Sequence, residues 1–301
     1  MTSGSSTALE RRETRLAWRL MVPALGLLAL VAAAPLVATG WESLHRHDVR
    51  LPWLGRPFVG FANYRQAFHD DRFVTALEHT VVFTAVSVTL ELSFGLAFAL
   101  ALDALARGRA VARVVLLLPW ALPTVVAALV WRFLFEGQSG IVNATLVWSG
   151  LAPREWLAGS FSAWVPIVFG DVWKSTPFVA LLLLAGLQGI DASLYEAARL
   201  DGAGSWLRFV EITLPLLRPA LVVALAFRAL DAFRVFDLVY VLTGGGPGAA
   251  TEVVSLYAFT TLLQDLQFGY ASALAMLVFL LSFMLALFCI PRLRVSVAPD
   301  R

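Results

Sequence analysis

Long apolar runs, separated by shorter polar segments, dominate the pattern of this 301-residue chain. Each run reaches or exceeds the roughly 20 residues that an apolar helix needs to span a bilayer core about 30 Å thick. The runs are continuously apolar and do not alternate, which favours helices over the strands of a β-barrel. The pattern therefore predicts an all-α membrane protein with six transmembrane helices. These helices are expected at residues 17–40, 74–102, 114–135, 161–189, 217–242 and 269–290.

The composition agrees with a membrane protein, because 59% of the residues are hydrophobic and 15% are charged. A soluble domain carries about 25% charged residues. The net charge of +2 is too small to favour nucleic acid, so no nucleic-acid partner is expected. The single cysteine, Cys289, has no second cysteine in the chain to form a disulfide with.

Arginine residues gather in segments that would all lie on one side of a six-span protein. Cytoplasmic segments are enriched in Lys and Arg, so we expect both termini in the cytoplasm. The predicted layout is a cytoplasmic tail at 1–16, a permease-like domain at 17–290 and a second cytoplasmic tail at 291–301. The first apolar run could instead belong to a cleavable signal peptide, but it exceeds 20 residues and lacks a clean small-x-small cleavage site before Trp41. The outer loop 41–73 is an exception to the charge pattern, since it carries five arginines.

Residues 191–216 form a polar, amphipathic island between the fourth and fifth apolar runs. Ser193, followed three residues later by Glu196, fits a capping box and predicts a short helix over 194–201. Gly202 would supply the left-handed residue that ends this helix. The island is either an ordinary interfacial helix pair or a docking surface for a soluble partner.

The second half of the island predicts another short helix, from Ser205 through Glu211, before Pro215 leads into the fifth run. The whole island closely resembles the loop by which membrane subunits of binding-protein-dependent ABC importers engage their ATPases. That family has Glu-Ala-Ala, three residues, Gly, nine residues and Ile-x-Leu-Pro, and this chain fits the pattern without a gap. The resemblance implies that the loop enters a cleft of an ATPase subunit, with Glu196 as its polar anchor and Gly202 as its pivot. The coupling residues that it implies are Glu196, Ala197, Ala198, Asp201, Gly202, Ile212, Leu214 and Pro215.

Three glycines and a proline, at 244–247, interrupt the outer end of the fifth run. They do not form a Walker A loop, because no Gly-Lys-Ser/Thr follows them and the only lysine, Lys174, follows a tryptophan. ATP chemistry must therefore come from a partner. The stretch 236–247 and the outer segment 58–64 resemble the sugar-type branch of the importer permeases, in the subunit similar to the first permease of maltose- and trehalose-type systems.

Charged residues lie inside the fourth and fifth predicted spans, where each costs about 2.5–3.5 kcal/mol near the bilayer centre. Those of the fifth span alternate in sign at three-residue steps, which lets neighbours pair along a helix. They either neutralise one another and hold the bundle together, or line a polar path for sugar hydroxyls with aromatic rings stacked on the sugar. Glu91, in the second span, has no partner that the sequence identifies. The candidate path residues are Asp171, Trp173, Lys174, Arg228, Asp231, Arg234, Asp237 and Tyr240, with Phe236 as a further stacking ring.

The sequence argues against an enzyme and against a metal site. Residues 137–140 match the Gly-x-Ser-Gly of rhomboid proteases, but the base in that family is a histidine in a later span. All four histidines here precede that serine. His45 and His47 have no carboxylate or cysteine cluster that would complete a metal site. We therefore expect no catalytic residue, no metal and no cofactor bound by this chain.

The resemblance implies a type I ABC importer permease fold in a bacterial inner membrane. The chain would form half of the translocation path for a di- or oligosaccharide. Its partners would be a second homologous permease, two ATPase subunits that bind ATP and Mg²⁺, and an extracytoplasmic sugar-binding protein. The competing prediction is a stand-alone secondary transporter or channel, which would work without nucleotide and without Glu196.

Overall fold

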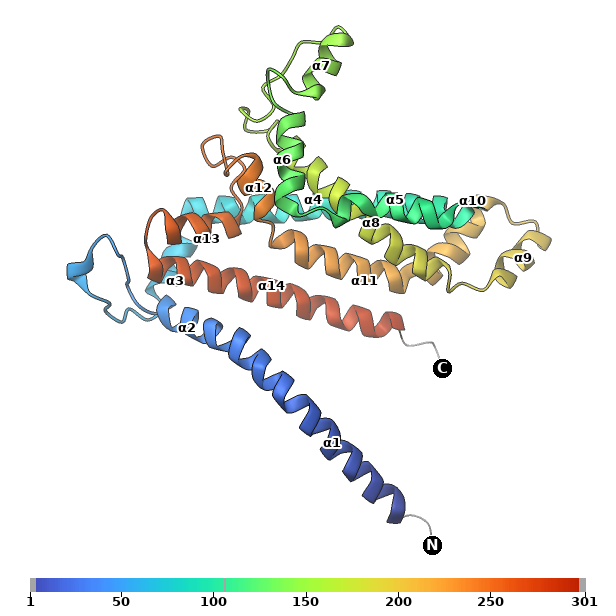
Figure 1. The fold of residues 1–301 in the computed structure, drawn as a ribbon, viewed down its shortest axis with the longest axis horizontal. Helices are drawn as coiled ribbons and strands as arrows, with labels where there is room; N and C mark the ends of the chain where they lie inside the picture. The colour runs from blue at the N-terminus through green and yellow to red at the C-terminus, as the bar shows by residue number, and fades with distance from the viewer. Residues whose placement is uncertain (1–3, 106, 298–301) are drawn as a thin grey trace. The chain divides into compact units, whose positions relative to one another are not determined.

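The computed structural model describes residues 4–105 and 107–297, and the regular elements of these segments are helices, apart from two isolated β-bridges (Figure 1). Within this part of the chain, five helices are long and apolar enough to cross a membrane: Glu13–Ser43, Asp71–Ala104, Trp164–Leu187, Ser205–Phe233 and Phe268–Cys289. A sixth span results if the bent pair Arg109–Ala121 and Thr124–Leu134 crosses as one unit. Each predicted apolar run corresponds to one of these segments.

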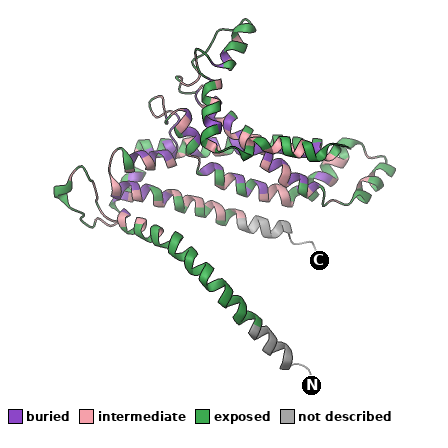
Figure 2. Cartoon of the chain, in the orientation of Figure 1, coloured by how far each residue is buried: buried purple, intermediate pink, exposed green. Residues whose placement is uncertain are grey.

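The described chain falls into two compact units, and the first comprises Met1–Ala67 and Thr261–Met276. Its first span consists of α1 (Gly4–Leu28), a π-helical turn at Ala29–Ala33 and α2 (Ala34–Ser43). Residues 13–28 are exposed along the whole helix surface (Figure 2). Since most of them are apolar, this surface suits contact with lipid.

The loop after α2 is held by side-chain hydrogen bonds to the backbone. Nδ2 of Asn63, in α3 (Ala62–Phe68), donates to the carbonyl oxygens of Ser43 at 2.7 Å and His45 at 3.0 Å. The hydroxyls of Ser43 and Tyr64 lie 2.6 Å apart. Asp48 pairs with Arg50, and this contact lowers the pKa of Asp48. The loop therefore has a defined conformation.

The second unit comprises Phe68–Thr260 and Leu277–Arg301 and holds most of the spans. Its longest helix, α4, is capped by the side chain of Asp70, which accepts the backbone N–H of Arg72 at 3.0 Å. The remaining helices are α4 (Asp71–Ala104), α5 (Arg109–Ala121), α6 (Thr124–Leu134), α7 (Ile141–Trp148), α8 (Trp164–Leu187), α9 (Ala192–Leu200), α10 (Ser205–Arg208), α11 (Leu214–Phe233), α12 (Asp237–Leu242), α13 (Val254–Leu263) and α14 (Phe268–Val297).

Two of the predicted spans are broken where the sequence pattern had suggested continuous helices. The third bends by 88° between α5 and α6, because Leu122 precedes Pro123 and takes the extended conformation that proline imposes on its neighbour. The fifth was expected to continue to residue 242, but α11 ends at Phe233. Val235 and Phe236, a β-branched and an aromatic residue of modest helix propensity, occupy the break.

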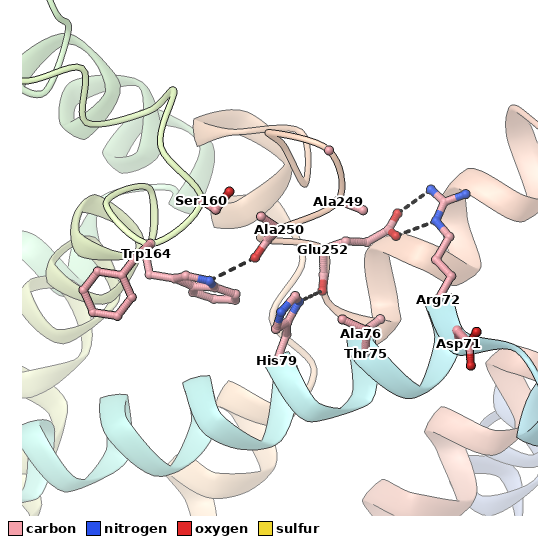
Figure 3. Close-up of a pocket in the computed structure, with 12 residues that line it drawn as sticks. Asp71, Arg72, Thr75, Ala76, His79, Ser160, Trp164, Ala249, Ala250 and Glu252 are labelled. Carbon is pink, nitrogen blue, oxygen red and sulfur yellow. Dashed lines mark hydrogen bonds and ion pairs between the residues drawn. The ribbon is translucent and has the colours of Figure 1, made fainter.

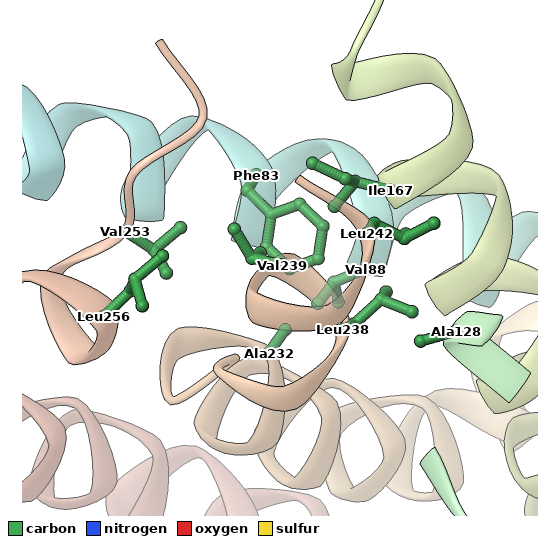
Figure 4. Close-up of a cluster of buried hydrophobic side chains, with 10 residues drawn as sticks. All are labelled: Phe83, Val88, Ala128, Ile167, Ala232, Leu238, Val239, Leu242, Val253 and Leu256. Carbon is green, nitrogen blue, oxygen red and sulfur yellow. The ribbon is translucent and has the colours of Figure 1, made fainter. Parts of the chain in front are cut away.

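Glycines allow α4, α8 and α11 to pack closely in the second unit. A Cβ placed on Gly95 of α4 would lie 2.5 Å from Cγ1 of Val179 on α8, and one on Gly186 of α8 would lie 2.7 Å from Cβ of Ala220 on α11. Small residues at such contacts are typical of membrane helix packing. A hydrophobic cluster then joins α4, α6, α8, α11 and α12 to the start of α13 and the residue before it (Figure 4). Its buried members are Phe83, Val88, Ala128, Ile167, Ala232, Leu238, Val239, Leu242, Val253 and Leu256.

Candidate coupling loop and translocation path

The first helix of the polar island, α9, begins two residues earlier than the capping box predicts. Asp191 is the N-cap, and its side chain accepts the backbone N–H of Ser193 at 2.9 Å. This hydrogen bond lowers the pKa of Asp191. The prediction that Ser193 caps the helix is therefore wrong, because a carboxylate two residues earlier takes the role.

Gly202 ends α9 in the left-handed conformation, with φ of +81°, as predicted. The N–H of Ala203 donates to the carbonyl of Ala198 at 2.8 Å, and that of Gly202 donates to Arg199 at 3.1 Å. This is the hydrogen-bond pattern of a glycine-terminated helix end, which satisfies carbonyls that would otherwise lack partners.

The segment after Gly202 is the beginning of the fifth span and does not form a separate helix. Helix α10, a π-helical turn at Phe209–Thr213 and α11 follow without a break, so the helix runs continuously over Ser205–Phe233. The expected stop at Glu211 is wrong, because the helix continues past Pro215, with the π-helical turn at Phe209–Thr213 directly before it. The hydroxyl of Tyr195 lies 3.0 Å from Oγ1 of Thr213 and ties α9 to this helix.

Apolar side chains on the island are unusually exposed. Leu200 is 90% exposed and Trp206 is 75% exposed, and Glu196, four residues before Leu200, is exposed as well. Exposed large apolar groups at a polar tip are typical of a surface that a partner covers. The sequence reasoning had selected the family-pattern residues and overlooked Leu200 and Trp206, although both stand out as large apolar residues inside a polar segment.

Charged residues of three helices meet inside the second unit. The guanidinium of Arg228 on α11 binds Glu91 of α4 through two hydrogen bonds, from Nε at 2.5 Å and from Nη2 at 2.7 Å. Nη2 also lies 3.3 Å from Oδ2 of Asp171 on α8, and Nη1 pairs with Asp231 on α11 itself. Glu91, which had no partner in the sequence, is therefore the fully buried partner of Arg228.

The predicted alternation of paired charges along the fifth span holds only for its first pair. Arg228 and Asp231 pair three residues apart, but the helix ends before Arg234 and Asp237. Arg234 donates instead to the carbonyl of Leu230 at 3.3 Å. Lys174 forms no salt bridge with the described residues. The structure thus brings Asp171, Arg228 and Asp231 together and leaves the other charged candidates outside this cluster.

The aromatic candidates already have ring partners. Phe236 and Tyr240 stack with ring centroids 5.4 Å apart, and Tyr240 remains 45% exposed. Trp173 makes an edge contact with Trp131 at 5.8 Å and is 38% exposed. Each ring therefore presents one accessible part to a ligand, while its neighbour fixes its orientation.

A cavity of about 530 Å³ lies between the start of α4, the start of α8 and the glycine-containing segment after α12 (Figure 3). Nε1 of Trp164 donates to the carbonyl of Ala250 at 3.0 Å, and Nδ1 of His79 donates to that of Glu252 at 3.0 Å. The carboxylate of Glu252 accepts two hydrogen bonds from Arg72, at 2.7 and 2.8 Å. These contacts fix the glycine-containing segment against α4, and nothing in the sequence had indicated them.

Residues 92–295 match the family described as "Binding-protein-dependent transport system inner membrane component". The chain belongs to this family, so it is a multi-pass inner-membrane permease component and not an enzyme. The predicted resemblance, the permease role and the membrane location are thereby confirmed.

Individual relatives cover almost the whole chain. The trehalose/maltose transport system permease protein MalF of Thermococcus litoralis is 43% identical over 98% of this chain and 99% of its own length. The trehalose transport system permease protein SugA of Mycobacterium tuberculosis is 39% identical over 91% of this chain and 87% of its own. A bacterial ABC transporter involved in the import of the acidic polysaccharide alginate has a TM-score of 0.82, at 21% identity, over 97% of this chain and 100% of that one. This likeness confirms the predicted all-helical importer permease fold.

Proposed function

We propose that this chain is one permease of an ABC importer for a di- or oligosaccharide. It would form half of the translocation path together with a second, homologous permease. Two ATPase subunits would bind ATP and Mg²⁺ and drive the cycle, and an extracytoplasmic binding protein would deliver the sugar. The observation that carries the sugar assignment is the full-length identity of 43% to a trehalose/maltose permease.

The surface around α9 suits the docking of an ATPase. Asp191 caps the N-terminus of α9, and Gly202 ends the helix at its C-terminus. Leu200 and Trp206 are exposed on this surface. We infer that these apolar groups enter the ATPase cleft beside Glu196, and that Ala197 and Ala198 permit close approach. The other proposed coupling residues, Asp201, Ile212, Leu214 and Pro215, extend the surface to the start of α11.

The polar cluster of Asp171, Arg228 and Asp231 is the proposed centre of the sugar path. Charged groups inside spans face protein or water and mark substrate pathways. Trp173 and Tyr240, each partly exposed, would stack on sugar rings. Binding of ATP would close the ATPases and shift the permease pair towards an outward-open state, because a ligand moves such an equilibrium through its different affinities for the two states. The arginine distribution supports both termini on the cytoplasmic side.

The test is co-purification of the tagged chain in mild detergent, with mass spectrometry of the bound proteins. We expect an ATPase with a Walker motif and a second six-span permease. Glu196→Ala should lower ATPase recovery about tenfold, which corresponds to ~1.4 kcal/mol, and should abolish ATP-driven sugar uptake in reconstituted vesicles. Glu78→Ala, an exposed glutamate of α4, is the matched control and should behave as wild type.

The competing function gives a different result in the same experiments. A stand-alone secondary transporter or channel would purify without an ATPase, and its sugar flux would not depend on ATP. Normal ATP-driven uptake by Glu196→Ala would refute the coupling loop, although the importer itself would stand.

A further inference from the structure

A second cavity, of about 510 Å³, lies between α4 and α8 and adjoins the cavity of Figure 3. Its lining residues recur at helical spacing over 78–86 of α4 and over 161–169 at the start of α8, so each helix contributes one continuous face. Apart from Glu78 and His79, the residues that line it are apolar. We call this cavity the apolar groove, and the cavity of Figure 3 the polar cavity.

The two cavities meet at three side chains with rings, since His79, Phe161 and Trp164 line both of them. The rings of His79 and Trp164 have centroids 5.4 Å apart, and each donates to a backbone carbonyl of the glycine-containing segment at 3.0 Å (Figure 3). Phe161 is 85% exposed beside them. Tryptophan is enriched where the hydrocarbon of a bilayer meets the polar headgroups. The junction of the two cavities therefore has the chemistry of a membrane interface.

The apolar groove follows the direction of the membrane-spanning helices. The eight steps from residue 78 to residue 86 of α4 correspond to about 12 Å of helix. One half of a hydrocarbon core about 30 Å thick is about 15 Å deep. The groove thus matches the depth of one leaflet. Phe83 is buried and forms its floor, whereas Val82 and Phe169 are 55% and 58% exposed.

The lining of the groove favours an acyl chain over a helix of another subunit. Membrane helices that pack on one another bring small residues to the contact, as Gly95 and Gly186 do within this unit. The described residues that line the groove include no glycine, alanine, serine or threonine. Its apolar side chains away from the junction are all branched or aromatic: Val82, Phe83, Val86, Val165, Val168 and Phe169. A flexible hydrocarbon chain can fit between such side chains, whereas a helix backbone cannot approach closely.

The polar cavity offers both donors and acceptors to a headgroup. The side chain of Arg72 is 46% exposed although it pairs with Glu252, and the hydroxyl residues Thr75 and Ser160 line the same cavity. These groups suit the oxygens of a phosphate. The carboxylate of Asp71, an exposed residue, suits an ammonium group. The cavity volume of about 530 Å³ lies within the range of about 300–1,000 Å³ that is usual for small-molecule sites.

We propose that the apolar groove and the polar cavity together bind one phospholipid with a zwitterionic headgroup. One acyl chain lies in the groove along α4 and α8. The phosphate and the ammonium group occupy the polar cavity, with Trp164 and His79 at the boundary between chain and headgroup. The site does not depend on the cargo of the permease, so a failure of the sugar assignment would leave this inference standing.

The first test is native mass spectrometry of the complete importer in mild detergent, with phosphatidylethanolamine as the probe. Val82→Trp fills the groove with an indole and should weaken retention of the lipid about tenfold. Val81→Trp is the matched control, since Val81 is the neighbouring exposed valine and does not line the groove. It should retain the lipid as wild type does. Equal retention by wild type and Val82→Trp would overturn the proposal. If Val82→Trp fails to insert, Val168→Trp on the opposite wall gives the same comparison.

The second test concerns the headgroup. Phosphatidylglycerol with the same acyl chains has the phosphate but no ammonium group, so wild type should retain it less than phosphatidylethanolamine. Asp71→Asn should reduce this preference, whereas Asp103→Asn, at the other end of α4, should preserve it. Equal retention of the two lipids by wild type would refute the zwitterionic headgroup.

The third test distinguishes a lipid from the second permease as the occupant. Benzoylphenylalanine in place of Val82 reacts on illumination with whatever lies in the groove. We expect an adduct of this chain with the mass of one phospholipid. An adduct with the second permease instead would identify the groove as an interface between the permeases and overturn the proposal.

Discussion

At Gly202 the effect of backbone conformation can be tested separately from the effect of side-chain contacts. Its φ is +81°, and a Cβ added there would meet no atom within 4 Å. A side chain at this position is therefore penalised by its backbone conformation alone within this chain. For an L-residue the left-handed region costs about 1–2 kcal/mol. That energy lowers the population of the native turn by a factor of about 5–30.

Gly202→Ala should therefore reduce ATP-driven uptake in reconstituted vesicles by up to this factor. Gly202→Asn should retain most of the activity, because asparagine tolerates the left-handed region. Gly204→Ala is the matched control, since Gly204 also has free space around a Cβ but an ordinary φ of −69°. The assay is the initial uptake rate at equal amounts of inserted protein.

The relative uptake rates of the three variants test the conformational explanation. If Gly202→Asn and Gly202→Ala are equally impaired, Gly202 is required for close contact with the ATPase and the conformational explanation is refuted. A Gly204→Ala variant as impaired as Gly202→Ala would refute it as well.

Two further predictions concern packing and capping. Gly95→Ala should lower the melting temperature of the purified chain, because overpacking against Val179 costs about 1–3 kcal/mol. Adding Val179→Ala should restore part of the lost melting temperature. An unchanged melting temperature in Gly95→Ala would contradict the close α4–α8 contact. The lowered pKa of Asp191 means that its contribution to α9 is present above its ordinary value of 3.8 and is lost as the pH falls through its lower folded value. At pH 7, hydrogen exchange at the Ser193 amide should be faster in Asp191→Ala than in wild type, whereas Asp191→Asn should keep the cap and lose its pH dependence; identical exchange in Asp191→Ala and wild type would show that the cap is dispensable.

The fold was predictable from the sequence because the membrane restricts the possibilities. An apolar run long enough to cross a bilayer is nearly bound to be a helix, so the six runs located the five long apolar helices and the bent pair α5–α6. The breaks were harder to foresee. Pro123 marks the bend between α5 and α6, and its effect on Leu122 follows a known local rule. The end of α11 at Phe233 carries no proline or glycine signal, since no such residue stands between Phe233 and Gly244.

The candidate site was predicted only in part, because the interactions that were missed join residues far apart in the sequence. Gly202 could be identified because a glycine-terminated helix depends on neighbouring residues only. Glu91 and Arg228 lie 137 residues apart, and their pairing depends on the packing of α4 against α11. A sequence shows that Glu91 is an isolated charge, and the cost of such a charge predicts that it has a partner. It does not reveal which of several arginines fulfils that role. The roles of the coupling and path residues stay predictions.

Because the helix is continuous from Ser205 to Phe233, Trp206 of the docking surface and Arg228 of the polar cluster lie on the same rod-like element. At 1.5 Å per residue, Arg228 lies about 35 Å along this rod from Ser205. A tilt of about 10° around the Ser205 end would move Arg228 sideways by about 6 Å, on the scale of a sugar ring, without any hinge inside the span. Because Gly186 lets α8 pack directly on α11, Asp171 would travel with it. An ATPase that tilts this helix by a small angle would thus displace Asp171 and Asp231 together. The path would open and close by rigid-body motion of helices and not by local unfolding.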